Sequence, residues 1–197
     1  MSKLGKVFIT SGIILILFSF SLLIIYNVED YKAKDASLKI LKAIEEEREI
    51  ASNIENLNSN DTKKQTLTID GNDYLGTINI PALNLNLPIL NDFSYDKLKI
   101  APCRYYGSLL TNNLIICGHS YKSHFAYLGN LKQNDLIIIT DASNNNYFYE
   151  VLEVEILGST DVEEMINNDF DLTLYTCTSD SQKRVTIRCN RIYKSFE

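Results

Sequence analysis

Histidine is scarce in this 197-residue chain, and runs of basic residues are absent from it. The chain has two histidines and no C-x-x-C pair among its four cysteines, so a zinc site would need an unusual ligand set. A groove for nucleic acid needs clustered Lys and Arg, whereas this chain carries a formal net charge of -6. We therefore expect no metal site, no cofactor and no nucleic-acid partner.

One long hydrophobic run lies near the amino terminus. No residue from Val7 to Val28 is charged, and the run has about the ~20 residues that a helix needs to cross a bilayer. A cleaved signal peptide is the alternative, but its apolar part would be shorter and would end in a small-x-small motif that is missing here. Lys3 and Lys6 precede the run and Glu29 and Asp30 follow it, which favours a cytoplasmic amino terminus. Residues 1–28 are thus predicted to form a cytoplasmic tip and a single-pass anchor in the cell membrane, with the rest of the chain extracytoplasmic.

The four cysteines would then lie in a compartment that permits disulfides. They are Cys103, Cys117, Cys177 and Cys189. Cys117 and Cys189 lie within apolar runs, and buried structural thiols are the ordinary interpretation of these two and of Cys103. We do not assume any disulfide from the sequence.

A helical stalk and linker are predicted over residues 29–70. Apolar residues recur there at loosely helical spacing, at Leu38, Leu41, Ile44, Ile50, Ile54 and Leu57. Lys42 and Glu46 are four residues apart, so their side chains can meet on the polar face. The segment NLNSNDTKKQ then interrupts the pattern with turn-forming residues, as a linker does. We expect the stalk to be a spacer; a coiled-coil dimer is an alternative that the irregular repeat does not favour.

From about residue 71 the chain changes to short β-branched and aromatic runs separated by Asn, Asp, Gly and Pro. The runs are YLGTINIP, LNLPIL, NLIICG, DLIIIT, YFYEVLEVEIL, DLTLYT and RVTIRCNRI. Seven or eight short strands with few helices predict a mostly-β, closed barrel over residues 71–197, because closure removes exposed strand edges. One helix is expected at DVEEMINND, with Asp161 as its N-cap.

Three residues at expected strand ends could support nucleophilic catalysis, which needs a thiol, a histidine for proton exchange and a donor for the oxyanion. Cys177 ends the run DLTLYTC and precedes a polar loop, the exposed setting in which cysteines react. His119 follows LIICG, and Gly118 gives the backbone freedom to present the imidazole. Arg184 opens the next strand; it stays protonated, so it can donate hydrogen bonds but cannot act as a base.

Two other residues compete for these roles. Arg188 shares a strand face with Arg184 by the period of two, but only Arg184 lies at the end near Cys177. A solvated or salt-bridged arginine is the ordinary interpretation of Arg188. His124 competes with His119, and geometry must decide which histidine is the base.

These residues occur in an order that resembles the sortase family. The segments CGHSYKSHFAYL, LTLYTCT and RVTIRC are similar to the sortase pattern of a Gly-His after the fourth strand, a T-L-x-T-C closing the seventh and an arginine opening the eighth. The segment GTINIPALNLNLPIL also resembles the first two strands of that fold. The resemblance spans roughly residues 74 to 192.

The resemblance implies an eight-stranded barrel and a cysteine transpeptidase that does not depend on calcium, on the outer face of a Gram-positive-type cell. By position, Cys177 matches the nucleophile, His119 the general acid/base, Arg184 the arginine that positions substrate and stabilises the oxyanion, and Thr176 a position lining the site. In the family, the cysteine cleaves a C-terminal sorting signal like Leu-Pro-x-Thr-Gly on secreted proteins. An amine, on lipid II, a peptidoglycan cross-bridge or a pilin lysine, then takes the acyl group from the thioester.

A short loop between Cys177 and Arg184, and a short helical segment between the sixth and seventh strands, favour a class D-like or compact class B-like sortase. Two other functions stay open. One is another extracytoplasmic cysteine protease or transpeptidase, which would not require Arg184. The other is a non-catalytic, membrane-tethered β-module with paired cysteines.

Overall fold

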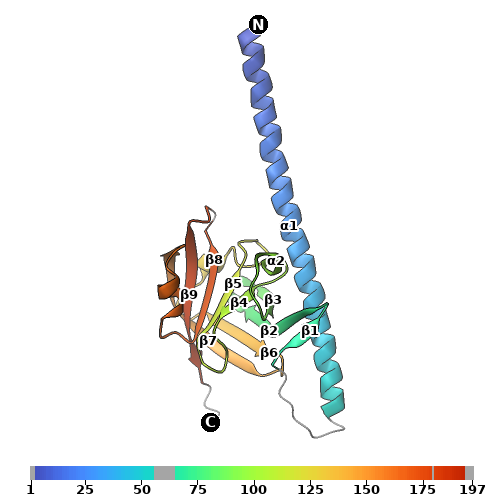
Figure 1. Ribbon diagram of the computed structural model, residues 1–197, viewed down its shortest axis with the longest axis vertical. Helices are drawn as coiled ribbons and strands as arrows, with labels where there is room; N and C mark the ends of the chain where they lie inside the picture. The colour runs from blue at the N-terminus through green and yellow to red at the C-terminus, as the bar shows by residue number, and fades with distance from the viewer. Residues whose placement is uncertain (1–2, 56–64, 179, 194–197) are drawn as a thin grey trace.

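The computed structural model describes residues 3–55, 65–178 and 180–193, and consists of one long helix beside a β-barrel (Figure 1). Helix α1 runs unbroken from Lys3 to Glu55. It joins the expected anchor and the expected stalk into a single element. The expected linker NLNSNDTKKQ lies outside the described residues, apart from its last residue.

Strands make up about half of the described chain after α1. In order, the elements are β1 (Leu67–Ile69), β2 (Asn72–Ile80), the 3₁₀ helix η1 (Pro81–Leu83), β3 (Leu85–Leu90), α2 (Tyr95–Leu98), β4 (Cys103–Tyr106), β5 (Leu114–Gly118), the 3₁₀ helix η2 (Leu128–Asn130), β6 (Leu136–Asp141), β7 (Asn146–Gly158), α3 (Val162–Ile166), β8 (Leu172–Cys177) and β9 (Lys183–Ile192).

Eight of these strands close into a barrel, as the sequence predicts. Neighbours follow the order β2-β3-β4-β5-β8-β9-β7-β6, and β6 pairs back onto β2 to close the ring. Closure brings strands β2 and β6 very close at Gly76. A Cβ at this position would lie 1.9 Å from the Thr140 carbonyl oxygen, so only glycine fits where the two strands meet. The barrel interior is filled by the inward side of each strand, including Ile78, Ile89 and Ile116.

Two strands, β1 and β4, were not among the predicted runs. Strand β1 begins upstream of residue 71 and pairs with the first residues of β2 through an Asp70-Gly71 turn, in which both residues have positive φ. Asp-Gly is the pair that such tight hairpin turns prefer, so the turn was readable although the three-residue strand was not. Strand β4 is four residues long and has no clear alternation.

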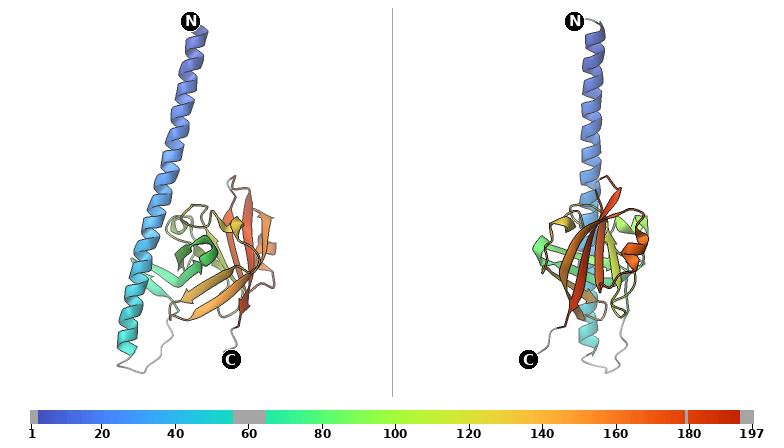
Figure 2. Two further views of the ribbon diagram at one scale, coloured as in Figure 1. Left: turned by 180° about the vertical axis from the view of Figure 1, so that it is seen from behind. Right: turned by 90° about the vertical axis from the view of Figure 1, so that its left-hand side faces the viewer.

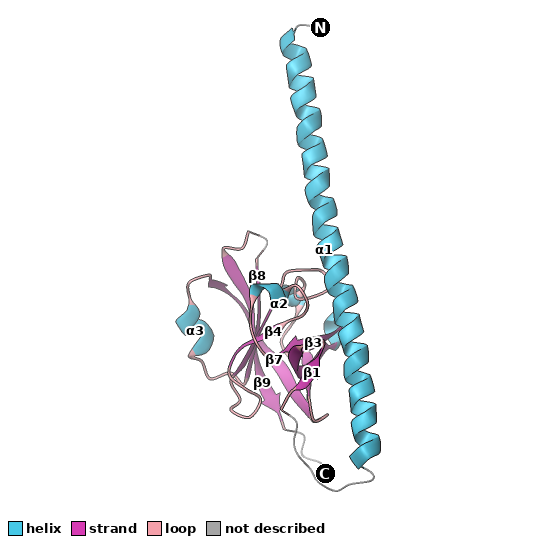
Figure 3. Ribbon diagram, turned by 45° about the vertical axis from the view of Figure 1, so that its right-hand side comes forward, coloured by secondary structure: helices cyan, strands magenta, loops and turns pink. Residues whose placement is uncertain are grey.

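Helix α1 has two halves in different surroundings (Figures 2 and 3). Its amino-terminal half is long and apolar enough to cross a membrane, and among the described residues before Ala33 none is buried. Its carboxy-terminal half packs on the barrel through Ala33, Ser37, Ile40 and Ile44, which are spaced as one helical stripe. Ile40 and Ile44 join β1–β4 residues in a second apolar cluster.

The packing adds a contact with the barrel that the expectation of a spacer did not include. Leu38 and Ile50, two of the residues used to define an apolar face, are each 55% exposed, whereas Ile40 is buried. The buried face also carries small and polar residues, Ala33 and Ser37, which a search for large apolar residues passes over. The Lys42–Glu46 pair forms as expected, at 3.7 Å on the exposed face.

Helix α3 lies within the predicted segment, with Asp161 at its N-cap position. The Asp161 side chain does not cap the helix. It turns backwards and accepts a hydrogen bond of 2.7 Å from the backbone N–H of Gly158, which fixes the end of β7. A second short helix, α2, was not predicted; it begins at the Ser94 cap, whose hydroxyl accepts from the Lys97 backbone N–H.

Candidate active site

Strand register brings three of the predicted site residues to one end of the barrel. Strands β5 and β8 are parallel, with Gly118 paired to Thr176, so His119, the first residue after β5, follows the sheet beside Cys177, the last residue of β8. Strands β8 and β9 are antiparallel, with Cys177 paired to Arg184. Because paired residues in adjacent strands lie about 5 Å apart at Cα, Cys177 has Arg184 on one side and the start of the His119 loop on the other.

Cys177 differs from the other three cysteines, all of which are described. Cys103, Cys117 and Cys189 are buried, whereas Cys177 is partly exposed, and all four thiols are free. Burial raises the pKa of Cys103 and of Cys117 to about 12, and it raises that of Cys189 as well. The three buried thiols therefore stay protonated at neutral pH, which leaves Cys177 as the accessible thiol.

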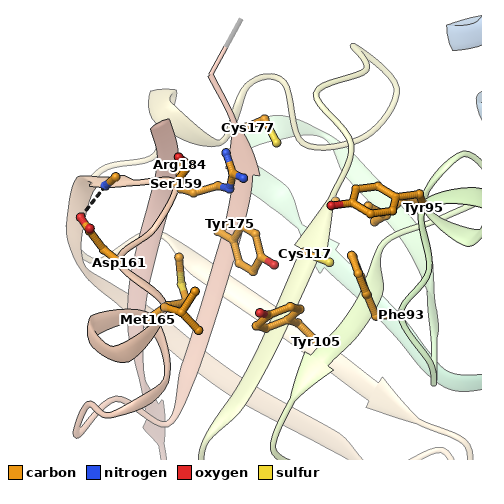
Figure 4. Close-up of a pocket in the computed structure, with 14 residues that line it drawn as sticks. Phe93, Tyr95, Tyr105, Cys117, Ser159, Asp161, Met165, Tyr175, Cys177 and Arg184 are labelled. Carbon is orange, nitrogen blue, oxygen red and sulfur yellow. Dashed lines mark hydrogen bonds between the residues drawn. The ribbon is translucent and has the colours of Figure 1, made fainter. Parts of the chain in front are cut away.

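Arg184 lies beside Cys177 at the mouth of the pocket shown in Figure 4. Its Nη1 donates to the carbonyl oxygens of Ser181 and Lys183, at 3.2 and 3.1 Å, which holds the side chain against its own hairpin. A guanidinium has five N–H donors, so these two hydrogen bonds do not exhaust it. Arg184 can thus hold its place and still donate to a bound ligand.

Arg188 is buried and removed from this end of the barrel. It lies four residues along β9 from Arg184, which is about 13 Å in an extended strand. Its Nε donates to Glu155 at 2.6 Å, and its Nη1 donates to Thr173. The structure therefore confirms a salt-bridged Arg188.

His119 is half-buried and stacks on Tyr121, with ring centroids 4.0 Å apart and an interplanar angle of 1°. Burial lowers its pKa, while the nearby Glu29 carboxylate acts in the opposite direction. The role expected of Gly118 is corrected: it has no positive φ, and a Cβ there would lie 2.4 Å from the Phe125 ring. Glycine is needed at this position for space, not for backbone freedom.

Thr176 is buried, with 3% of its surface exposed, and its hydroxyl donates to the Gly118 carbonyl oxygen at 2.9 Å. It ties β8 to the residue before His119. It is not among the described residues that line the pocket.

The pocket beside Cys177 has a volume of about 260 Å³ (Figure 4). Its wall is largely aromatic and apolar, with Phe93 and Tyr95 from the α2 side, Tyr105 and Tyr175 from the sheet, and Met165 from α3. Among the residues that the structure describes, no cluster of three or more His, Cys, Asp or Glu could hold a metal ion. The charged residues of the pocket lining are Arg184 and Asp161, so an apolar ligand group would find more matching surface there than a charged one.

A family model of the sortase domain matches residues 78–192, from within β2 to the end of β9. The chain belongs to the sortase family. That matched region contains His119, Cys177 and Arg184, in that order along the chain. None of the curated proteins matches the sequence.

Solved sortases share the fold. Sortase C1 from Streptococcus agalactiae is 26% identical with a TM-score of 0.57, over 68% of this chain and 74% of that chain. A sortase D5 transpeptidase from Clostridium perfringens is 19% identical with a TM-score of 0.58, over 83% of this chain and 99% of that one. Sortase A from Corynebacterium diphtheriae is 24% identical with a TM-score of 0.55, and the match covers 63% of each chain, less than two thirds of that relative.

His124, the rival histidine of this sortase, is buried against α1. Its Nε2 lies 3.2 Å from the Ser37 hydroxyl, whose hydrogen goes to the Ile100 carbonyl oxygen at 2.9 Å. His124 must then donate from Nε2 and carry no proton on Nδ1. Burial lowers its pKa to about 4, so it is neutral at pH 7.

The sequence reasoning missed the contribution of α1 and α2 to this sortase site. The sequence does not single out Tyr121, and Glu29 enters the sequence analysis only as a charge that follows the apolar run. Both side chains meet at the His119 loop, through a hydrogen bond across 92 residues of chain. The helical stripe that continues from residue 33 back through Asp30 and Tyr26 was the available signal.

Proposed function

We propose that this sortase is a cysteine transpeptidase with Cys177 as nucleophile, His119 as general acid/base and Arg184 as the oxyanion donor. The observation that carries the proposal is the strand register, which sets Cys177 opposite Arg184 and beside the start of the His119 loop. Thr176 supports the set by tethering Gly118, in place of a direct substrate contact.

The chemistry follows from these roles. The Cys177 thiolate attacks a peptide carbonyl carbon, and Arg184 donates hydrogen bonds to the oxygen as it becomes negative. The peptide C–N bond breaks as His119 protonates the leaving amine, which leaves a thioester on Cys177. An acceptor amine then attacks the thioester and gives its proton to His119. A new amide forms and the thiolate is released, without any need for ATP.

We propose that the acyl donor is a C-terminal sorting signal of secreted proteins, like Leu-Pro-x-Thr-Gly. The aromatic and apolar pocket wall supports a segment with Leu and Pro lying over Tyr105, Tyr175 and Met165. We propose an amine of the cell wall precursor, such as lipid II or a peptidoglycan cross-bridge, as acceptor. The compact α3 segment of five residues supports the class D-like or compact class B-like assignment.

We also propose a membrane location for the enzyme. The amino-terminal half of α1 is long and apolar enough to span a bilayer, and Lys3 and Lys6 precede it. The positive-inside rule then places the amino terminus in the cytoplasm and the barrel outside it. Residues 1–28 would form the tip and anchor, residues 29–70 the barrel-packed helix and linker, and residues 71–197 most of the catalytic barrel.

The test is an acyl-transfer assay of the full chain in detergent micelles, with a library of sorting-signal peptides and a small amine, read by mass spectrometry. Cys177→Ala should abolish cleavage and transfer. Arg184→Ala should lower kcat/KM by roughly 10²- to 10³-fold, the usual loss for one oxyanion donor. Lys183→Ala, which removes the neighbouring exposed cation of the same hairpin, is the matched control and should stay near wild type.

Two results would overturn the proposal. Equal losses in Arg184→Ala and Lys183→Ala would remove Arg184 from the mechanism and favour another kind of cysteine enzyme. A full chain that forms no thioester adduct with any peptide, while Cys177 stays reactive to a small alkylating agent, would favour a non-catalytic module.

A further inference from the structure

Helix α1 holds the loop that follows β5 at four places. Tyr26 Oη donates to the Ser120 carbonyl oxygen at 3.1 Å, and Tyr121 Oη donates to Glu29 Oε2 at 3.4 Å. Ser123 donates to Asp30 Oδ1 from both its backbone N–H and its hydroxyl, each at 2.8 Å. The fourth contact joins His124 to the Ser37 hydroxyl. The loop begins at His119. The proposed acid/base, His119, therefore lies in a loop that is hydrogen-bonded to helix α1.

Tyr121 contacts both helix α1 and His119. Its side chain is 3% exposed, its ring lies parallel to the imidazole, and its hydroxyl reaches Glu29. A parallel ring at 4.0 Å leaves the imidazole little freedom to rotate about its last side-chain bond on that face. The plane of the His119 ring is thus set by Tyr121, and Tyr121 is in turn held by Glu29.

The charges around His119 come from three elements. Glu29 on α1 favours the protonated imidazole, whereas Lys99, directly after α2, and burial both disfavour it. His124 faces the same region but is neutral at pH 7. Burial and Glu29 both raise the pKa of Tyr121, so its hydroxyl keeps the hydrogen that it donates to Glu29.

We propose that Tyr121 and Glu29 are positioning residues for His119, so that the anchor helix is part of the active site. The inference rests on the proposed role of His119 as the acid/base. Tyr121 fixes the plane of the imidazole, and Glu29 fixes Tyr121 and supplies a negative charge that favours the imidazolium. Neither residue touches the reacting atoms.

Asp30 offers a matched control, because it bonds the same loop from the same helix but its hydrogen bonds go to Ser123, whereas Glu29 bonds Tyr121. If α1 merely stabilises the loop, Asp30→Asn and Glu29→Gln should act alike. If α1 positions His119, only Glu29→Gln should change the properties of that imidazole. Exposed Glu47 on α1 supplies a second control, Glu47→Gln, for the loss of one charge.

The experiment is an NMR titration of the full chain with ¹³C-labelled histidine in detergent micelles. The chain has two histidines, so His119→Ala assigns both signals. Glu29→Gln should lower the pKa of His119, because it removes the charge that favours the imidazolium. Tyr121→Leu should raise it towards the ordinary value of about 6.5, because the imidazole becomes more solvated. Tyr121→Phe keeps the ring but loses the hydrogen bond to Glu29, so the pKa of His119 should lie between that in Tyr121→Leu and that in wild type.

The variants that change the pKa of His119 should also change kcat. Tyr121→Leu should lower kcat by roughly 10-fold with little change in KM, because a misdirected base slows proton transfer without weakening peptide binding. Glu29→Gln should lower kcat by a smaller factor, and Asp30→Asn and Glu47→Gln should leave both kcat and the His119 pKa unchanged. Melting temperatures identify any variant that fails to fold, and Tyr121→Phe then remains as the conservative test.

The two levels of the argument fail differently. Acyl transfer that survives in His119→Ala overturns the proposed function. Loss of transfer in His119→Ala, together with a His119 pKa and kcat in Glu29→Gln and Tyr121→Leu that match those of Asp30→Asn, overturns this inference alone.

Discussion

The two halves of α1 show how one unbroken helix can meet two different environments. Before Ala33 its described side chains are all exposed or half-exposed although most are apolar, whereas after Ala33 a narrow stripe is buried although half of the residues over 34–51 are charged. From Val7 to Ile25 the apolar side chains of the first half are left exposed by the rest of the described chain, whereas the second half packs on the barrel. Total hydrophobicity therefore distinguishes the half that is apolar enough to cross a bilayer, and periodicity distinguishes the half that packs on protein.

The largest effect should come from Ile44, which is fully buried between α1 and the barrel. Ile44→Ala should lower the free energy of unfolding of the full chain in micelles by about 2 to 5 kcal/mol, through lost burial and a cavity. Leu38→Ala in the same half and Ile16→Ala in the other half remove exposed side chains. Both should leave the denaturant midpoint of the barrel nearly unchanged, and equal effects at the three positions would erase the contrast between the halves.

Acid should lower the stability of the packing between the second half of α1 and the barrel, because His124 lies in that contact. The pKa of this histidine is about 4 in the folded chain against about 6.5 in the unfolded one, so between these pH values the unfolded chain binds a proton that the folded chain does not. Stability should thus be full above pH 6.5 and fall by up to roughly 3 kcal/mol as the pH drops to 4. In denaturant unfolding across this range, His124→Gln should be flatter than wild type, and parallel curves would contradict the prediction.

The smallest effect should come from the exposed face of the same half. Lys42 and Glu46 are 3.7 Å apart, and both side chains are mostly in solvent. Lys42→Ala should change the free energy of unfolding by about 0.5 kcal/mol or less, because water and salt screen such a pair. A loss as large as that of Ile44→Ala would mean that this face also has a partner.

The barrel was predictable where strands carry long apolar or alternating runs. The seven predicted runs became β2, β3, β5, β6, β7, β8 and β9, and barrel closure followed from their number and shortness. The short strands β1 and β4 were not predicted, because three or four residues are too few for a period to be recognised. Their place is decided by pairing with residues elsewhere in the chain, such as Cys103 with Cys117.

The candidate site was predictable to the extent that its residues lie at strand ends. Cys177 and Arg184 face each other because a hairpin joins them, which a sequence shows directly. The contact of Glu29 with Tyr121 depends on how a helix docks against a loop 92 residues away, and no local pattern encodes that distance. The packing of Gly118 against Phe125 was hidden for the same reason, since the volume around a glycine is set by the tertiary fold.

The hydrogen bond between Tyr26 and Ser120 joins the barrel to α1 close to the end of the apolar run. It therefore limits how far the barrel can lie from a bilayer that this run would cross. Val28, the last residue of the apolar run, directly precedes Glu29, and the β8–β9 hairpin lies at the end of the barrel from which the first half of α1 rises (Figure 1). With that half in a bilayer, as proposed, Cys177 would lie at the end of the barrel nearer to the lipid headgroups, at a fixed height. The helix would then fix the distance between Cys177 and the bilayer. That distance would favour acyl donors and acceptor amines that are themselves attached to the membrane over amines deeper in the cell wall.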